Sequence, residues 1–269
     1  MDIGASRMSY PKPTDAQVAF FDEHGYLVVQ DAIAEHDLVE IETFCDGILA
    51  DKENLANDWA WDERESSEER SFRIVQANPF ELFPELDDQI YRTWAATFGS
   101  ALLGRAVAFK YDQFLAKRPG HSVPTWWHQD EGYWGRALTN RGITCWIPLQ
   151  DVDETNGCMH FSDGAHRRGV FPHERVPGLK SDILRCEVDD SKTIACPIRR
   201  GSVTFHHSAT PHMTTENRSR RWRKALTQHF WDPEVPHGPA GGDFYEWRVI
   251  APQTKSTARA SGLRTEDEA

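Results

Sequence analysis

The sequence predicts a mainly β protein, in which helices in the first hundred residues support an antiparallel double-sheet jelly roll. From Val107 onward, short β-type runs are separated by Gly, Pro, Asn and Asp, whereas apolar residues before this point recur at helical spacing. A chain of 269 residues suits one barrel-sized unit. We expect a single domain over residues 1–251, with the jelly-roll core at about 107–231 and a mobile tail at 252–269.

Three helices are predicted before the jelly roll. The first covers Asp15 to His24, with Thr14 as its cap and Gly25 as its stop, and one early strand follows it. The second covers Glu35 to Leu49, where apolar side chains form a single stripe, and the third lies near Leu86 to Leu103. These helices are expected to support the catalytic core.

Residues 59–70, between the second and third helices, form a charged run. This run fits either an active-site flap or a solvated loop, and its composition favours the loop. The jelly roll itself is predicted from seven β-type runs, which are Val107–Lys117, Thr125–Asp130, Ile143–Leu149, Cys158–Ser162, Thr193–Ile198, Ser202–His206 and Arg223–Trp231.

Charge and composition exclude several functions. A net charge of -12 and a pI near 5.4 disfavour a nucleic-acid partner, which requires a basic surface. The five cysteines are odd in number and lack a Cys-x-x-Cys pair, so no disulfide framework or structural zinc site is expected. The sequence has no apolar run of about 20 residues and no apolar signal core in Met1 to Gln17. We expect a cytoplasmic protein with no membrane partner, and its oligomeric state stays open.

The motif His128-Gln129-Asp130 predicts a metal site. Side chains two residues apart on a strand share a face, so His128 and Asp130 can bind one ion while Gln129 points elsewhere. A third ligand must come from another strand, for which the candidates are His206, His207 and His212. We predict His212, because its position relative to Arg223 gives the most coherent site. Two imidazoles and one carboxylate form the minimal facial set for a catalytic non-haem Fe(II), and leave room for a bidentate co-substrate and O2.

The residues after His212 predict a binding site for an anionic co-substrate. If a hairpin turns at Asn217-Arg218, His212 and Arg223 lie directly opposite each other on neighbouring antiparallel strands, and Thr214 shares their face. Arginine binds carboxylates through two parallel hydrogen bonds. We therefore predict that Arg223 and Thr214 hold the distal carboxylate of a 2-oxo diacid.

Further motifs accompany these positions. They are Phe20 to Val29, Lys117-Arg118-Pro119-Gly120, Trp146-Ile147-Pro148-Leu149, Asn156-Gly157-Cys158-Met159, and Phe205, His212, Asn217 and Arg223-Lys224-Ala225-Leu226. With these motifs the chain, from about Phe20 to about Trp231, resembles the phytanoyl-CoA dioxygenase (PhyH-like) family of Fe(II)- and 2-oxoglutarate-dependent oxygenases. The resemblance implies a double-stranded β-helix (cupin-like jelly roll).

By this resemblance His128, Asp130 and His212 are the iron ligands, and Arg223 anchors 2-oxoglutarate. One departure is Ser162-Asp163-Gly164-Ala165-His166, where the family usually has Pro-Gly-Ser-His, and it affects only the conformation of that loop. Related halogenases replace the carboxylate ligand by a small residue, so Asp130 favours hydroxylation or desaturation over halogenation.

The other candidate residues rest on position alone. Gln113 and Lys117 alternate along the strand before the metal motif and are candidates for the C1 carboxylate of 2-oxoglutarate, with an ordinary surface role as the alternative. Tyr133 and Trp134 follow the last ligand of the motif and are candidate substrate contacts, with core packing as the alternative. Arg73 and Gln76 are candidates for a polar substrate group, although a surface role fits them better.

The sequence thus predicts a dioxygenase that uses Fe(II), 2-oxoglutarate and O2. We expect it to hydroxylate an unactivated C–H bond of a small-molecule metabolite, with release of succinate and CO2. Two alternatives stay open: a non-catalytic jelly-roll protein that binds a small molecule, and a zinc hydrolase that uses the same triad. Neither alternative needs Arg223.

Overall fold

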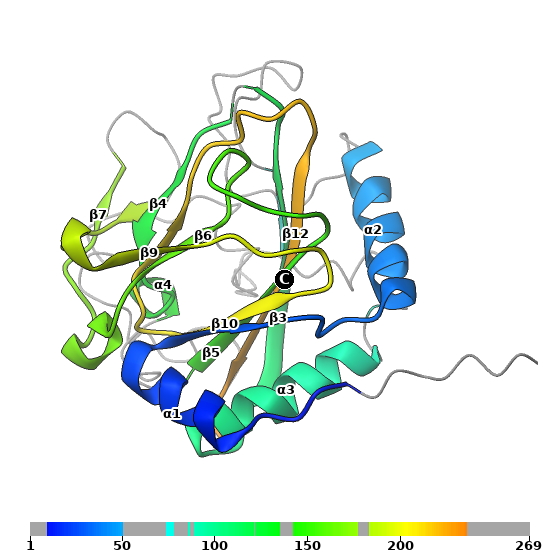
Figure 1. Ribbon diagram of the computed structural model, residues 1–269. Helices are drawn as coiled ribbons and strands as arrows, with labels where there is room; N and C mark the ends of the chain where they lie inside the picture. Colours follow the sequence, from blue (N-terminus) through cyan, green and yellow to red (C-terminus); the bar gives the residue numbers. More distant parts are fainter. Residues whose placement is uncertain are drawn as a thin grey trace, which may run out of the picture.

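Two antiparallel sheets dominate the part of the chain that the computed structural model describes, which is residues 10–50, 74–77, 86, 89–120, 122–134, 142–176 and 183–235 (Figure 1). The larger sheet has six strands in the order β1-β10-β5-β12-β3-β2, and the smaller has four in the order β4-β11-β6-β9. The predicted mainly β class is confirmed. The charged run at 59–70 and the tail at 252–269 lie outside the described residues.

The strands of the larger sheet are β1 (Tyr26–Val29), β2 (Ile74–Ala77), β3 (Ala108–Lys117), β5 (Gly142–Pro148), β10 (Val203–His207) and β12 (Arg223–Trp231). Those of the smaller sheet are β4 (Thr125–His128), β6 (Met159–Ser162), β9 (Thr193–Cys196) and β11 (His212–Thr214). A short ribbon pairs β7 (Glu174–Arg175) with β8 (Leu184–Arg185). All seven predicted runs are strands, with ends that differ by up to two residues.

Helix α1 (Asp15–His24) begins and ends where the sequence predicts. The Thr14 hydroxyl accepts the backbone N–H of Gln17, the Gln17 side chain accepts the N–H of Thr14, and Gly25 ends the helix at φ 78°. The other long helices are α2 (Glu35–Ala50) and α3 (Ile90–Leu103), and a short turn, α4 (Glu131–Trp134), follows the metal motif. No helix among the described residues combines the length and apolar character that a bilayer crossing needs.

The two faces of the larger sheet have different surroundings. Leu226 and Phe230 of β12 point to the outer face, where they join the apolar cluster that includes Phe98 of α3 and Ile41 of α2. Figure 1 shows α1 and α3 along one side of this sheet and α2 beside it. The alternate β12 residues point to the interior between the two sheets, where Ala225 packs in a second cluster. One face of β12 therefore packs against the helices through Leu226 and Phe230. The opposite face of the strand lines the interior between the sheets.

Two local predictions are wrong. Strand β4 ends at His128 rather than Asp130, because the carbonyl oxygen of Asp130 accepts the N–H groups of Tyr133 and Trp134 and so begins the α4 turn. The predicted hairpin that pairs His212 with Arg223 does not form. Strand β11 pairs with β4 and β6 in the smaller sheet, whereas β12 pairs with β3 and β5 in the larger one.

The connection from β11 to β12 crosses between the sheets instead of turning within one. Asn217, which is 1% exposed, stabilises this connection because its side-chain amide donates to the carbonyl oxygens of Lys117 and Arg221. His212 therefore lies opposite His128, and Arg223 lies opposite Lys117.

Candidate active site

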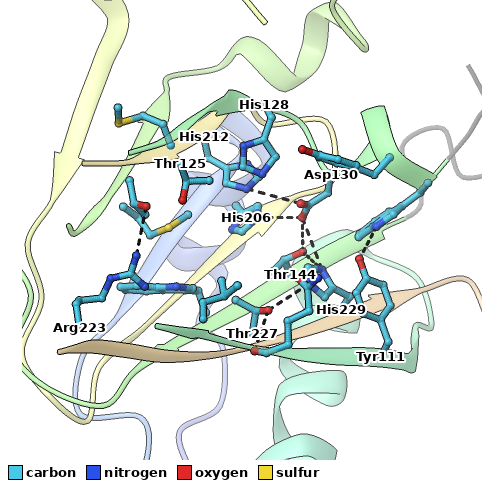
Figure 2. A pocket seen from close by; sticks show the side chains of 18 residues that line it. Tyr111, Thr125, His128, Asp130, Thr144, His206, His212, Arg223, Thr227 and His229 are labelled. Carbon is cyan, nitrogen blue, oxygen red and sulfur yellow. Dashed lines mark hydrogen bonds and ion pairs between the residues drawn. The ribbon is translucent and has the colours of Figure 1, made fainter. Parts of the chain in front are cut away.

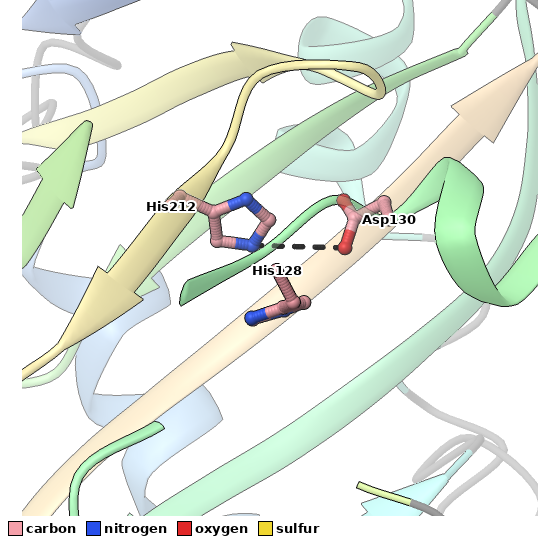
Figure 3. Close-up of side chains that lie close together, drawn as sticks. All are labelled: His128, Asp130 and His212. Carbon is pink, nitrogen blue, oxygen red and sulfur yellow. Dashed lines mark ion pairs between the residues drawn. The ribbon is translucent and has the colours of Figure 1, made fainter. Parts of the chain in front are cut away.

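Three side chains predicted as metal ligands meet in the interior. One ligand atom each from His128, Asp130 and His212 lies within 4.8 Å of the others (Figure 3). The two histidines are register partners on β4 and β11, and Nε2 of His212 is 3.7 Å from Oδ1 of Asp130. The smaller sheet thus supplies both imidazoles, and the turn after β4 supplies the carboxylate.

Backbone carbonyls fix the orientation of both imidazoles. Nδ1 of His128 lies 2.7 Å from the carbonyl oxygen of Trp126, and Nδ1 of His212 lies 2.9 Å from that of Thr210. A carbonyl oxygen only accepts hydrogen bonds, so each Nδ1 carries a proton and Nε2 is the ring nitrogen left to bind a metal ion. In both cases the carbonyl belongs to the residue two positions earlier, so the local backbone orients each ring.

The charge states of the site suit a divalent metal ion. Burial, reinforced by the neighbouring imidazoles of His206 and His128, holds the pKa of His212 well below its ordinary value, which leaves the ring neutral. Burial opposes the charge of Asp130, but the hydrogen bond that its Oδ2 accepts from Nε2 of His206 favours the ionised carboxylate, and its pKa is held well below its ordinary value. Neutral imidazole nitrogens and an ionised carboxylate oxygen on one side of a cavity are the donor set that fits Fe(II).

Arg223 faces this site across the interior. Its side chain is 2% exposed, its Nη2 lies 3.4 Å from the Thr214 hydroxyl, and its guanidinium carbon is 5.7 Å from the centre of the Trp146 ring. Gly157 lies beside the arginine: a Cβ there would lie 2.9 Å from the carbonyl oxygen of Thr215 and 3.4 Å from Arg223 Nε. The predicted association of Arg223 with Thr214 thus exists, although the two residues belong to opposite sheets.

A cavity of about 710 Å³, including the part that opens to solvent, connects these groups (Figure 2). The three metal-ligand candidates, Arg223 and Thr214 all line it. Figure 2 shows Arg223 at one end of the cavity and Tyr111 at the other, with the metal-ligand candidates between them.

The two candidates for the C1 carboxylate lie in different surroundings. Gln113 lines the cavity, and its Oε1 is 3.3 Å from Nε2 of His229. The buried ammonium group of Lys117 instead donates to the carbonyl oxygens of Thr214 and Thr215, which ties β3 to the end of β11. Contact of either residue with 2-oxoglutarate stays a prediction.

The structure separates the four predicted substrate contacts. Tyr133 and Trp134 line the cavity; the Tyr133 hydroxyl accepts the N–H of Leu184, and Nε1 of Trp134 donates to the Tyr111 hydroxyl. Gln76 lies on the edge strand β2, where its backbone is the register partner of Phe114. Arg73 lies outside the described residues.

His206 and His207, the alternative candidates for the third ligand, have other roles. His207 accepts the backbone N–H of Ala209 and lies 5.3 Å, ring to ring, from His166. His206 turns its Nε2 to Oδ2 of Asp130 at a distance of 3.1 Å. His206 is therefore a neighbour of the carboxylate rather than a member of the three-residue ligand group.

Sequence reasoning missed several residues of the cavity wall, namely Thr144, Trp146 and His229, and considered His206 only as a possible third ligand. Strand alternation alone places Thr144 and Trp146 on one face of β5, but their partners depend on strand register, which the sequence does not specify. Trp146 is notable because its indole N–H is buried and has no hydrogen-bond partner among the described residues. It is a donor close to Arg223 that a bound carboxylate can satisfy.

Several known proteins are similar to this chain. A bovine phytanoyl-CoA dioxygenase domain-containing protein 1 is 30% identical over 137 residues, which cover 45% of this chain and 46% of that protein, so the match spans under half of the relative's length. Bovine peroxisomal phytanoyl-CoA dioxygenase is 20% identical over 241 residues, which cover 80% of this chain and 68% of that protein.

Among solved structures, EvdO2 from Micromonospora carbonacea var. aurantiaca, complexed with 2-oxoglutarate, shares the fold. Its TM-score is 0.69 at 24% identity, over 89% of this chain and 99% of that one. The profile of the phytanoyl-CoA dioxygenase (PhyH) family matches residues 21–225, which is most of the chain. The chain therefore belongs to the phytanoyl-CoA dioxygenase family.

Proposed function

We propose that this protein is an Fe(II)- and 2-oxoglutarate-dependent oxygenase that hydroxylates a small molecule. One observation carries the proposal: a facial set of two imidazoles and a carboxylate opens into the same cavity as a buried arginine from the opposite sheet. The triad accounts for a metal ion, and the arginine accounts for a dianionic co-substrate. The EvdO2 structure, which contains 2-oxoglutarate in the same fold, supports the choice of co-substrate.

Each residue has a defined task in this proposal. His128, Asp130 and His212 hold Fe(II), which when bound supplies the redox chemistry for O2 activation and the oxidative decarboxylation of 2-oxoglutarate. Arg223 binds the C5 carboxylate with the Thr214 hydroxyl beside it. The reaction consumes substrate, 2-oxoglutarate and O2, and it yields hydroxylated substrate, succinate and CO2.

The substrate end of the cavity has aromatic walls. Tyr111 lines it at the end remote from Arg223 (Figure 2), Trp134 donates to the Tyr111 hydroxyl, and the Tyr111 and His229 rings stack at 4.2 Å. Tyr133 lines the same cavity, with its ring 5.7 Å from that of His128. Flat aromatic side chains favour an apolar or ring-bearing metabolite. In such a site the C–H bond held beside the metal is the one oxidised, so positioning selects the product.

The family name does not define the substrate, since one fold and site accept many molecules. A cytoplasmic location is part of this proposal. Because a bovine relative is named as peroxisomal, fractionation of cells that contain the protein is the appropriate check.

Oxygen-dependent conversion of 2-oxoglutarate to succinate by the Fe(II)-loaded protein tests the proposal. We expect slow turnover alone and faster turnover with a member of a metabolite library, together with a product 16 mass units heavier than the substrate. Asp130→Ala, which removes one ligand, should abolish both. A binding protein or a zinc hydrolase would form no succinate. Absence of succinate formation by the Fe(II)-loaded protein would therefore contradict the proposal.

A further inference from the structure

Three polar side chains form a row across the floor of the cavity. His206 on β10 is the register partner of Thr144 on β5, and Thr144 is in turn the partner of His229 on β12. All three line the cavity and are 1%, 1% and 4% exposed, respectively. They therefore form one rung of the six-stranded sheet that faces the metal-ligand candidates (Figure 2).

The rung meets the carboxylate of Asp130 at a single oxygen. The Thr144 hydroxyl lies 2.6 Å from Oδ2 of Asp130, and Nε2 of His206 lies 3.1 Å from the same atom. Nδ1 of His229 lies 2.9 Å from the Thr144 hydroxyl. These contacts join Asp130, which follows β4 of the smaller sheet, to three strands of the larger sheet.

The direction of each hydrogen bond follows from the chemistry of the groups. An ionised carboxylate only accepts, so the Thr144 hydroxyl and Nε2–H of His206 must both donate to Oδ2. Thr144 has a single hydroxyl proton, which this bond uses. Nδ1–H of His229 therefore donates to the Thr144 oxygen, and this bond orients the threonine proton toward Asp130.

These two donors distinguish the two oxygens of the carboxylate. Oδ2 already accepts two hydrogen bonds, whereas Oδ1 faces Nε2 of His212. We propose that Thr144 is a positioning residue, which together with His206 holds Asp130 so that only Oδ1 binds the metal ion. A carboxylate that bound through both oxygens would occupy a coordination position that the co-substrate and O2 require.

Asp130 needs this support more than the other ligands do. His128 and His212 lie on paired strands, and a backbone carbonyl orients each ring. Asp130 lies in the turn after β4, where no strand pairing holds it. The Thr144 contact replaces that restraint, because it fixes the carboxylate against the opposite sheet.

Thr144→Val and Thr144→Ser form a matched pair for the test. Valine keeps the shape of threonine and removes the hydroxyl, whereas serine keeps the hydroxyl. Fe(II) affinity is measured without oxygen by competition with a coloured chelator, and unfolding of the metal-free protein is followed in parallel. We expect about 10- to 100-fold weaker Fe(II) binding in Thr144→Val, and near wild-type binding in Thr144→Ser.

A second readout separates positioning from packing. The visible band that forms when 2-oxoglutarate binds the Fe(II) protein should shift in Thr144→Val and stay in place in Thr144→Ser, because it reports the ligands of the metal ion. Thr144→Ala serves as a second variant without a hydroxyl. Wild-type affinity in Thr144→Val, or equal losses in valine and serine variants, would overturn the proposal.

The inference rests on the proposed metal site, and the experiment keeps the two apart. If the unchanged protein takes up no Fe(II), the proposed function fails before the comparison begins. If it takes up Fe(II) and both variants bind equally well, only the role of Thr144 is wrong.

Discussion

Arg223 is a charged side chain that the fold buries almost completely, at 2% exposure. Its place at the end of the cavity lets the planar guanidinium fork meet a carboxylate that enters the cavity. The Thr214 hydroxyl and the Trp146 ring lie beside it. These surroundings suit one carboxylate of a bound diacid.

Replacement of Arg223 by lysine tests whether the planar shape of the guanidinium group, rather than its positive charge alone, is needed to bind the carboxylate. Arg223→Lys keeps a positive charge but loses the planar fork that binds both oxygens of a carboxylate. We expect 2-oxoglutarate to bind at least about tenfold more weakly, which is about 1.4 kcal/mol. Isothermal titration of the Fe(II) protein without oxygen measures this loss. Fe(II) affinity is the control, and it should not change because Arg223 is not a ligand.

At the level of single residues, the sequence specifies the candidate ligands but not what orients them. His128 and Asp130 follow from a local motif, and His212 follows from its place before Arg223. His206, Thr144 and His229 meet only because three strands align at one level. That alignment depends on pairing between segments up to 85 residues apart, as the Thr144–His229 bond shows.

Among the elements, β11 and β12 show how a correct contact can arise from a wrong topology. The sequence predicts that a hairpin brings Arg223 to His212, whereas the two strands lie in different sheets. Arg223 still reaches Thr214, because both point into the space between the sheets. A short connection between two β runs fits a hairpin and a crossing between sheets equally well, so local signals do not distinguish them.

Gln129 links the segment between the candidate ligands His128 and Asp130 to two neighbouring loops. Its amide nitrogen donates to the carbonyl oxygens of Gly169 and Ala209, and its amide oxygen accepts the N–H of Phe171. Gln129 is 0% exposed, and these three hydrogen bonds give both the nitrogen and the oxygen of its amide partners in the interior. As the sequence predicts, Gln129 points away from its neighbours in the metal motif.

Gln129→Glu should destabilise the fold. The substitution removes two donors, places an oxygen atom against two carbonyl oxygens and adds a negative charge at a fully buried position. We expect the free energy of unfolding to fall by about 3 kcal/mol or more, measured by urea denaturation. Gln17→Glu is the matched control: it makes the same chemical change in the exposed capping box of α1, where Glu is equally suitable. Equal effects at the two sites would contradict this assignment.

For the whole molecule, buried neutral histidines make stability depend on pH. Burial lowers the pKa of His173 to about 4, even though its Nδ1–H donates to the carbonyl oxygen of Phe171. Its Nε2 accepts the N–H of Gln129, which a protonated ring cannot do. Burial also lowers the pKa of His229 to about 4 and that of His207 to about 3.

These shifts predict a loss of stability in mild acid. Between about pH 6.5, where an unfolded histidine titrates, and about pH 4, the unfolded chain binds protons that the folded protein does not. The free energy of unfolding should therefore fall as pH decreases through this window, by up to about 1.4 kcal/mol per pH unit for each such histidine. Urea denaturation at several pH values measures the slope. His173→Gln, which keeps an acceptor for Gln129, should give a shallower slope, and an unchanged slope would contradict the role of His173.

The architecture as a whole is predicted better than its details. Helix α1, the β-rich core and the mainly β class follow from periodicity and turn residues, which are local signals. The division of strands between two sheets depends on long-range pairing, and so do the cavity and the rung beneath the metal site. The charged run at 59–70 and Arg73 fall outside the described residues, so predictions for them stay predictions.

The most direct test of the central claim is a titration of the Fe(II)-loaded protein with 2-oxoglutarate in the absence of oxygen, followed by visible absorption. We expect a weak charge-transfer band in the unchanged protein, no band in His212→Ala because the metal site is incomplete, and a band only at higher 2-oxoglutarate concentration in Arg223→Ala. Failure of the unchanged protein to take up iron, or a band that forms equally well in all three proteins, would contradict the account.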